Sequence, residues 1–206
     1  MDWTELVGAI LSLWGVWLTM QRKLSSCVIG LVSVVVYGWV FIQARLYSDA
    51  LLQGVFGVMI VYTWIHWARH LDDSQRVRVA PLGLKPAVLH LALGAVGAAV
   101  LGYLMHRYTD AALPWLDSAL TSYSLVGQWW DAKRHAATWW MWIAVDTIYV
   151  GEYIYKALDI TAVLYAVFVL MSVQGLRRWN QAAAKEASTT PEQDSTPAAA
   201  TKLSTH

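Results

Sequence analysis

Residues 139–155 read Trp-Trp-Met-Trp-Ile-Ala-Val-Asp-Thr-Ile-Tyr-Val-Gly-Glu-Tyr-Ile-Tyr, an apolar and aromatic stretch with one aspartate, Asp146, near its middle. The length and composition predict a membrane-spanning helix. At about 100° per residue, one face of this helix holds five side chains in a stripe roughly 80° wide: Trp139, Trp142, Asp146, Tyr149 and Tyr153. An ionised carboxylate that faces lipid costs at least a few kcal/mol, so we expect Asp146 to face a cavity inside a helix bundle.

Aromatic rings beside a carboxylate suit a flat organic ligand that is cationic or strongly polar. The ring faces attract cations, and the carboxylate supplies negative charge and hydrogen-bond acceptors. The stripe therefore indicates a solute-binding site in a membrane protein. The alternative interpretation is structural: a neighbouring hydroxyl group satisfies Asp146, and the tryptophans anchor the helix at the membrane interface.

The composition of the whole chain also indicates the bilayer. Its 206 residues are 57% hydrophobic and 14% charged, with 13 tryptophans, whereas soluble domains contain about 25% charged residues. The net charge of +1 and the lack of a dense basic face argue against nucleic acid as a partner. The sequence has no phosphate-binding loop, no nucleophile motif and no metal-ligand spacing. We therefore expect neither an enzyme nor a metal or other cofactor.

Seven stretches are long and apolar enough to span a bilayer or nearly so, which predicts an all-α integral membrane protein with seven transmembrane helices. They are Leu6–Met20, Val28–Ala44, Ala50–Ala68, Ala87–His106, Ser118–Trp130, Thr138–Tyr155 and Ile160–Leu176. Only Arg45, Arg107 and Lys156 fall on the side opposite to the other lysines and arginines. Because basic loops stay in the cytoplasm, we expect the N-terminus outside the cytoplasm and the C-terminus inside it.

Two halves of the sequence are related by a shift of 112 positions without a gap. The identical pairs include Gly15 with Gly127, Trp17 with Trp129, Arg22 with Arg134, Tyr37 with Tyr149, Phe56 with Phe168 and Trp67 with Trp179. This pattern predicts two parallel three-helix repeats, residues 5–69 and 117–179, joined by a linker helix at 87–106. Transporters with parallel repeats bind the solute between the halves near the membrane midplane. We take 1–180 as the transmembrane domain and 181–206, rich in alanine, serine, threonine and proline, as a disordered cytoplasmic tail.

Further polar candidates lie outside the first stripe. One helical face of the fifth span carries Asp117, Thr121, Ser124, Gln128 and Asp131. Such a line of polar residues either lines a passage or joins helices by hydrogen bonds. From this face we select Thr121, Ser124 and Gln128 as candidate substrate-binding residues.

The third span adds two more candidates, Gln53 and Trp64. Gln53 corresponds to Tyr165 in the second repeat, and such divergence is expected when a duplicated scaffold binds an asymmetric ligand. Trp67, at the cytoplasmic end of the same span, is expected to be an interface anchor.

Several segments, in their order and spacing, resemble the Pnu-type (PnuC-like) vitamin transporters from Glu5 to Trp179. They are Leu46–Gln53, Tyr62–Trp67, Gln128, the Trp139-x-x-Trp142 pair with Asp146, Lys156–Phe168 and Gly175-x-x-x-Trp179. The resemblance implies a three-plus-one-plus-three helical fold similar to the SWEET sugar transporters. It also implies a homotrimer in the bacterial inner membrane, so the N-terminus that the basic loops place outside the cytoplasm is expected in the periplasm.

The same resemblance implies facilitated diffusion of nicotinamide riboside for NAD biosynthesis, with a cytoplasmic kinase that traps the solute by phosphorylation. It implies that Trp139 and Trp142 pack against the substrate rings and that Asp146 stabilises the pyridinium cation. Gln128 and Gln53 then bind amide or ribose groups. Relatives carry thiamine or riboflavin, so these vitamins stay open as substrates. A proton-coupled carrier, in which Asp146 exchanges protons, also stays open.

Overall fold

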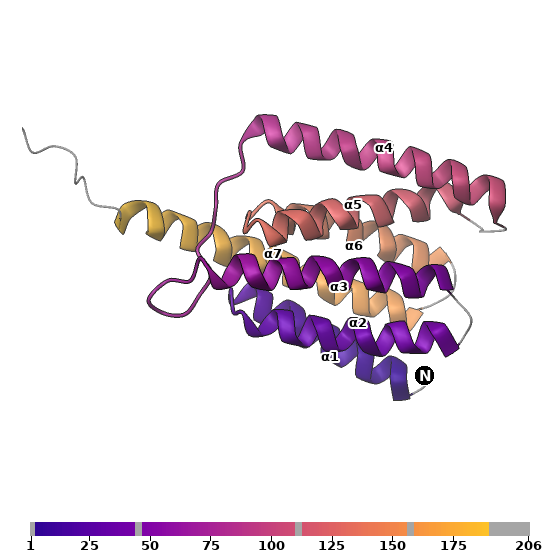
Figure 1. Ribbon diagram of the computed structural model, residues 1–206, viewed down its shortest axis with the longest axis horizontal. Helices are drawn as coiled ribbons and strands as arrows, with labels where there is room; N and C mark the ends of the chain where they lie inside the picture. The colour runs from indigo at the N-terminus through magenta and orange to yellow at the C-terminus, as the bar shows by residue number, and fades with distance from the viewer. Residues whose placement is uncertain (1–2, 44–46, 110–112, 156–158, 190–206) are drawn as a thin grey trace, which may run out of the picture.

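The computed structural model describes residues 3–43, 47–109, 113–155 and 159–189, which fold into seven α-helices (Figure 1). The helices are α1 Trp3–Met20, α2 Ser25–Gln43, α3 Tyr47–Ala68, α4 Leu84–Tyr108, α5 Pro114–Ala132, α6 Thr138–Tyr155 and α7 Asp159–Thr189. The predicted all-α fold with seven helices is confirmed, and most helix ends lie within a few residues of the expected positions.

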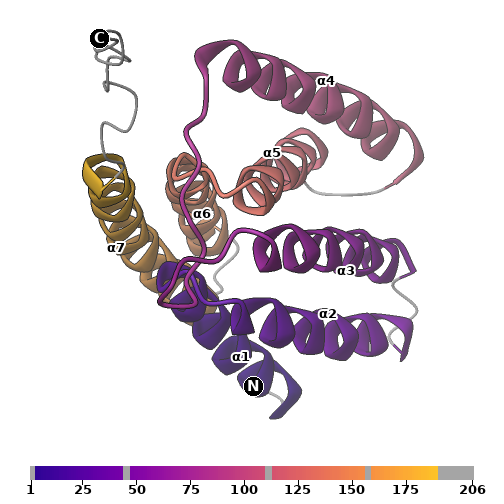
Figure 2. The ribbon, with the colours of Figure 1, turned by 60° about the vertical axis from the view of Figure 1, so that its left-hand side comes forward.

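Six helices form a ring made of two triplets. α2 packs between α1 and α3, and α6 packs between α5 and α7. Contacts of α1 with α7 and of α3 with α5 close the ring, while α4 lies outside it against α5 (Figure 2). Exchanging α1, α2 and α3 for α5, α6 and α7 leaves this set of contacts within the ring unchanged. The arrangement is that of a three-plus-one-plus-three fold.

The first turn of each triplet has the same backbone form. In the turn after α1, Arg22 has a φ of 59°, and in the turn after α5, Arg134 has a φ of 66°. In each case the backbone N–H of the arginine donates to the carbonyl three residues earlier, that of Thr19 at 2.9 Å or that of Asp131 at 2.8 Å. A left-handed residue is a common way to end a helix, and here it lets the next helix run back beside the first.

The loop between α3 and α4, residues 69–83, binds both of these turns. The N–H of Val77 donates to the carbonyl of Arg22, and the N–H of Ala80 donates to the carbonyl of Arg134, each at 2.9 Å. Figure 2 shows the loop running across this end of the bundle. The loop therefore holds the two triplets together at the end where most basic residues lie.

Trp67 and Trp179 form the centre of the core at the same end. Both are 0% exposed, and their ring centroids lie 5.9 Å apart. The indole N–H of Trp67 donates to the carbonyl of Asp131 at 3.0 Å, and that of Trp179 donates to the carbonyl of Thr19 at 3.1 Å. Each repeat thus binds the turn of the other through equivalent residues. The expectation that Trp67 is an interface anchor is wrong, because protein encloses its side chain.

The last helix is longer than the sequence predicted. We expected a disordered tail soon after the seventh span, yet α7 continues to Thr189. Near its end, Glu186 forms a salt bridge with Arg22 at 2.7 Å and accepts a hydrogen bond from the N–H of Val79 at 3.0 Å. These contacts with the first turn and the α3–α4 loop stabilise the added turns of helix. Residues 190–206 lie outside the described residues, and their expected disorder stays a prediction.

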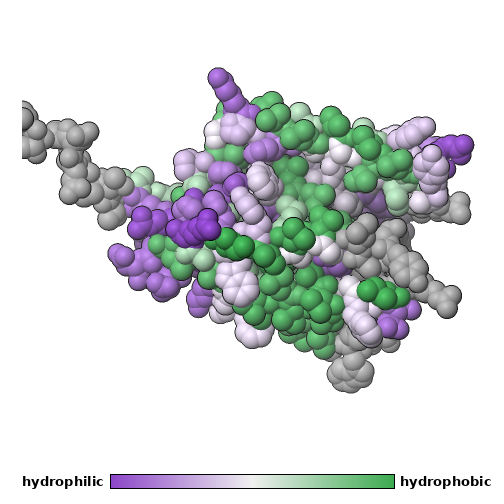
Figure 3. All heavy atoms as spheres, in the orientation of Figure 1, coloured by the Kyte–Doolittle hydropathy of each residue, from purple (hydrophilic) through white to green (hydrophobic). Residues whose placement is uncertain are grey.

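The outer surface of the bundle is apolar. Figure 3 shows a broad hydrophobic band over the middle of the helices, with hydrophilic residues gathered at the end that carries the α3–α4 loop. By length and composition, two helices in the described ranges could cross a membrane by themselves, Leu84–Tyr108 and Ile160–Ser188. α1, α2 and α3 contain shorter apolar stretches, and α5 and α6 carry the buried acids Asp131 and Asp146. Acids inside an apolar shell are typical of a membrane bundle with a functional interior.

Candidate functional site

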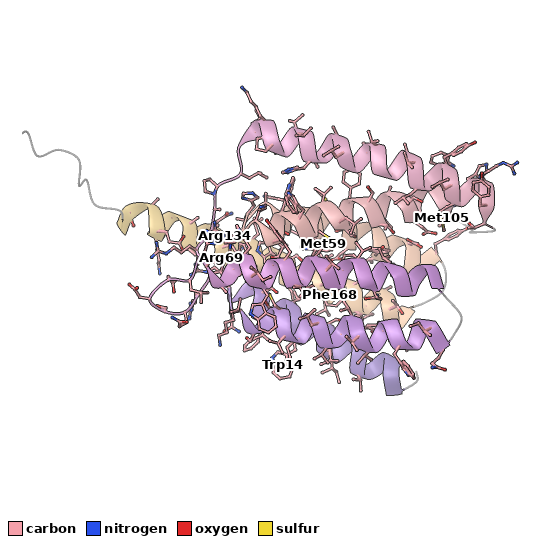
Figure 4. All side chains as sticks on the ribbon, viewed as in Figure 1. Trp14, Met59, Arg69, Met105, Arg134 and Phe168 are labelled. Carbon is pink, nitrogen blue, oxygen red and sulfur yellow. The ribbon has the colours of Figure 1, made fainter. Side chains whose placement is uncertain are left out.

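A cavity of about 260 Å³ lies between the two triplets. Its walls come from α1, α5, α6 and α7 and consist of Val16, Thr19, Asp131, Trp139, Trp142, Asp146, Tyr165, Phe168 and Ser172. In Figure 4, Phe168 lies about half-way along the bundle, whereas Arg69 and Arg134 lie at one end. The cavity therefore extends to the mid-depth at which repeat transporters bind their solutes.

The aromatic and acidic face of α6 forms one wall of this cavity. Trp139, Trp142 and Asp146 all line it, because spacings of three and four place their side chains on one side of the helix. The carboxylate of Asp146 is largely shielded, with the residue 7% exposed. The neighbouring hydroxyl of Thr147 donates to the carbonyl of Ile143 at 2.6 Å instead of to Asp146. The structure thus brings together three of the residues that the sequence predicted.

A glycine on α7 fixes the position of Trp139. A Cβ atom on Gly175 would lie 2.6 Å from the indole ring, closer than any side chain permits. The ring also packs edge-on against Trp179, with centroids 5.8 Å apart and planes at 79°. Trp139 is therefore a closely packed part of the cavity wall.

The next two residues of the stripe, Tyr149 and Tyr153, form an aromatic cluster with Tyr165. The three ring centroids are separated by 5.7, 5.0 and 5.0 Å. Tyr165 itself lines the cavity and packs edge-on against Phe168 at 5.6 Å. Because Tyr149 and Tyr153 follow Asp146 along α6, the cluster lies on the side of the cavity away from the α3–α4 loop.

A second cavity, also of about 260 Å³, adjoins the first and shares Val16, Thr19 and Asp131 with it. Residues of α2 and α3 complete its wall, among them Cys27, Gly30, Val34, Phe56 and Ile60. In the repeat these five correspond to Trp139, Trp142, Asp146, Phe168 and Ser172 of the first cavity. The two cavities are thus adjoining halves of one site that occupy equivalent places in the two repeats. Where the first half has Trp139, Trp142 and Asp146, the second has the smaller side chains of Cys27, Gly30 and Val34.

The remaining predicted residues lie in different places. Gln128 lines the second cavity. Gln53 lies in an outer groove between α2 and α3, where its Cβ faces Gly38, and Trp64 is 38% exposed on the outer surface. Two more, which line neither cavity, are the half-buried Thr121 and the buried Ser124. Helical periodicity predicted that these side chains share a face, but it could not tell which neighbour that face would meet.

Asp131 is a site residue that the sequence pattern did not predict. It ended the polar face of α5, and in the structure it lines both cavities. The residue is 9% exposed, and its Oδ1 atom has no hydrogen-bond partner among the described residues. The repeat contained the signal, because Asp131 corresponds to Thr19 and both residues lie where the halves meet.

The two cavities together form an acidic and aromatic site. Asp131 and Asp146 both line the first cavity, and no lysine, arginine or histidine of the described chain lines either one. Carboxylates shielded from water attract a cation strongly, and aromatic faces add to this attraction. The arrangement suits a planar cation and disfavours an anion.

Comparison with known proteins identifies relatives of the same design. Residues 2–181 match the family model of nicotinamide mononucleotide transporters. The nicotinamide riboside transporter PnuC of Escherichia coli is 23% identical over 91% of this chain and 89% of that protein. The riboflavin/roseoflavin transporter RibM of Streptomyces davaonensis is 25% identical over 86% of this chain and 84% of the length of that transporter. The crystal structure of the vitamin B3 transporter PnuC superimposes with a TM-score of 0.74 at 22% identity, over 89% of this chain and 83% of that one.

Proposed function

The chain belongs to the nicotinamide mononucleotide transporter family, and from this premise we propose that it carries nicotinamide riboside across the bacterial inner membrane for NAD biosynthesis. The family is one of membrane transporters rather than enzymes, and the resemblance to the Pnu-type transporters is confirmed. Relatives are named for different vitamins, so the choice of substrate rests on the site itself.

The observation that carries this choice is the position of Asp146 beside Trp139 and Trp142 on one cavity wall. Nicotinamide riboside contains a flat pyridinium cation and an uncharged ribose. The tryptophan rings can pack against the pyridinium ring, and the carboxylate of Asp146 can stabilise its charge. Gln128 lines the adjoining half of the site, and its amide, which both donates and accepts, can bind the ribose.

The described cavity walls contain no basic residue, which argues against the phosphorylated form, nicotinamide mononucleotide, as the substrate. Its phosphate group carries nearly two negative charges at neutral pH. In the described lining, Asp131 and Asp146 would repel these charges, and no cationic side chain is present to bind them. A buried phosphate without such partners is strongly disfavoured.

We propose that transport is facilitated diffusion, followed by phosphorylation of the riboside by a cytoplasmic kinase. The lack of an ATP-binding motif in the sequence supports this mechanism. The riboside would enter the cavity from one side and leave when the two repeats move relative to each other. The basic end with the α3–α4 loop would face the cytoplasm, with the N-terminus in the periplasm, and the family resemblance supports a homotrimer within the lipid bilayer.

A proton-coupled carrier is the second candidate, because two largely buried acids line one cavity. Membrane acids of this kind also serve as proton relays. Uptake of the riboside into proteoliposomes, measured with and without a protonophore, separates the two mechanisms. We expect equal uptake under both conditions; uptake that collapses with the protonophore would favour the coupled carrier.

Calorimetry on the purified chain tests the substrate. The titrated compounds are nicotinamide riboside, nicotinamide mononucleotide, thiamine and riboflavin. We expect the riboside to bind at least about ten-fold more tightly than the mononucleotide, a difference of about 1.4 kcal/mol. Thiamine is the cationic alternative and riboflavin the neutral one. Tighter binding of the mononucleotide or of riboflavin would contradict the proposal, and tighter binding of thiamine would identify the alternative cation.

A further inference from the structure

Two polar atoms with no partner among the described residues belong to the wall of the first cavity. One is the carboxylate oxygen Oδ1 of Asp131, and the other is the indole nitrogen Nε1 of Trp139. Asp131 is 9% exposed and Trp139 is 2% exposed, so bulk water has little access to either. One atom is an acceptor and the other is a donor.

The structural roles of these residues do not use the two atoms. Asp131 accepts hydrogen bonds from Trp67 and Arg134, but through its backbone carbonyl. At the equivalent position of the first repeat, the hydroxyl of Thr19 donates to the carbonyl of Gly15 at 3.0 Å. The first repeat therefore satisfies its polar side chain locally, whereas the second repeat has a buried carboxylate oxygen without a partner on a residue that lines the cavity. Buried polar atoms without partners are rare in folded proteins and call for an explanation.

We propose that Asp131 is a second substrate-binding carboxylate, which together with the indole N–H of Trp139 binds the carboxamide on the substrate ring. This inference rests on the proposed function, since it concerns the same site and the same substrate. The carboxamide NH₂ donates to Oδ1 of Asp131, and its oxygen accepts from Nε1 of Trp139. In this arrangement Trp142 packs against the face of the cationic ring and Asp146 stabilises its charge, while Trp139 meets the edge of the substrate ring through its indole N–H instead of stacking on its face. The pair thereby selects the amide over the corresponding acid, whose carboxylate would be repelled by Asp131.

The test compares nicotinamide riboside with nicotinic acid riboside, in which a carboxylate replaces the carboxamide. Calorimetry measures both ligands on the purified full chain and on Asp131→Asn. In the unmodified protein we expect the amide to bind at least about ten-fold more tightly than the acid. Asp131→Asn removes the negative charge, so we expect weaker binding of the amide and tighter binding of the acid. This opposite response is the signature of direct contact between Asp131 and the carboxamide.

Three variants serve as controls. Asp146→Asn should weaken the binding of both ligands, because both contain the same cationic ring. Trp139→Phe should also weaken both, because each ligand has an oxygen that accepts from the indole N–H. Asp117→Asn, on the same helix as Asp131 but outside the cavity, should change neither affinity. Elution profile and unfolding temperature show whether each variant folds.

The outcomes separate this inference from the proposed function. If the unmodified chain binds neither riboside, the proposed function itself is wrong. If the unmodified chain binds nicotinamide riboside, but Asp131→Asn changes the affinities for the amide and the acid in the same direction or changes neither, the inference alone is wrong. Should Asp131→Asn fail to fold, equal binding of amide and acid by the unmodified chain would overturn the inference. A strong preference of the unmodified chain for the amide, together with weaker binding of both ligands by Trp139→Phe, would support it.

Discussion

The two repeats share one backbone frame but present different side chains to the site. Arg22 and Arg134 adopt the same left-handed conformation, and Trp67 and Trp179 bind across the centre in a reciprocal pair. The cavity walls do not follow this symmetry. α2 presents Cys27, Gly30 and Val34 where α6 presents Trp139, Trp142 and Asp146. The frame fixes where the site lies, and the divergent wall residues decide what it can bind.

The two repeats also differ in the residues that pack behind the cavity wall. On α7, Gly175 leaves room for the large ring of Trp139. The corresponding pair in the first repeat is Thr63 and Cys27, which both line the second cavity. A large residue beside a glycine thus replaces two residues of medium size, as close packing of the interior requires. The second repeat therefore accommodates its aromatic wall within the same helix arrangement as the first.

The largest effect is expected from breaking the shared frame. Trp67→Ala and Trp179→Ala each remove a fully buried ring and a hydrogen bond to the opposite repeat. We expect each to lower the free energy of unfolding by about 3–5 kcal/mol, measured by denaturation of the purified protein in detergent. Because the two residues are equivalent, the two losses should be similar. A large loss for one variant and none for the other would show that the frame is not symmetric.

The next effect tests the divergent wall. Asp146→Asn keeps the size of the side chain and removes its charge, so the affinity for a cationic substrate should fall by roughly 1–3 kcal/mol. A neutral analogue without the ring charge should be affected little. Val34→Asn, at the equivalent position of the first repeat, is the matched control and should not change the response to ring charge. Equal losses for cation and neutral analogue would mean that Asp146 is structural.

The sequence could predict the frame because the frame repeats. The lengths of the apolar stretches predict the seven helices, and the shift of 112 positions identifies Trp67 and Trp179 as equivalent residues of the two repeats. The stripe of Trp139, Trp142 and Asp146 could be predicted because all three lie on one helix face. The role of Asp131 could not, since it depends on how α5 is rotated between the two cavities.

The two main departures have the same physical origin. Gln53 has a polar side chain on a predicted helix, but the packing of α3 on α2 turns it into an outer groove. The end of α7 is rich in alanine and lacks an apolar stripe. It is helical in the structure, where Glu186 forms a salt bridge with Arg22, a residue distant in the sequence. Local pattern predicts which residues share a helix face. Only tertiary packing decides which partner that face meets.

A smaller effect is expected from a substitution at Gly175, which packs behind Trp139 in the cavity wall. Gly175→Ala places a methyl group against the ring of Trp139, and overpacking of this kind costs about 1–3 kcal/mol. We expect a lower unfolding temperature and weaker substrate binding, because the ring must tilt out of place. Gly151→Ala on α6 is the control, since a Cβ there meets no atom within 4 Å. Equal behaviour of the two variants would show that Trp139 moves freely and does not fix the cavity wall.

The smallest effect concerns the end of α7, which has no counterpart in the first repeat. Truncation after Gln181 removes Glu186 and with it the salt bridge to Arg22 and the hydrogen bond from Val79. Glu186 is 30% exposed at its side chain and Arg22 12%, so we expect a loss of about 1 kcal/mol in stability. Truncation after Thr189 keeps these contacts and should change neither stability nor uptake. If both truncations left the unfolding temperature unchanged, Glu186 would not stabilise the turn and loop; if both reduced uptake, the residues after Thr189 would take part in transport.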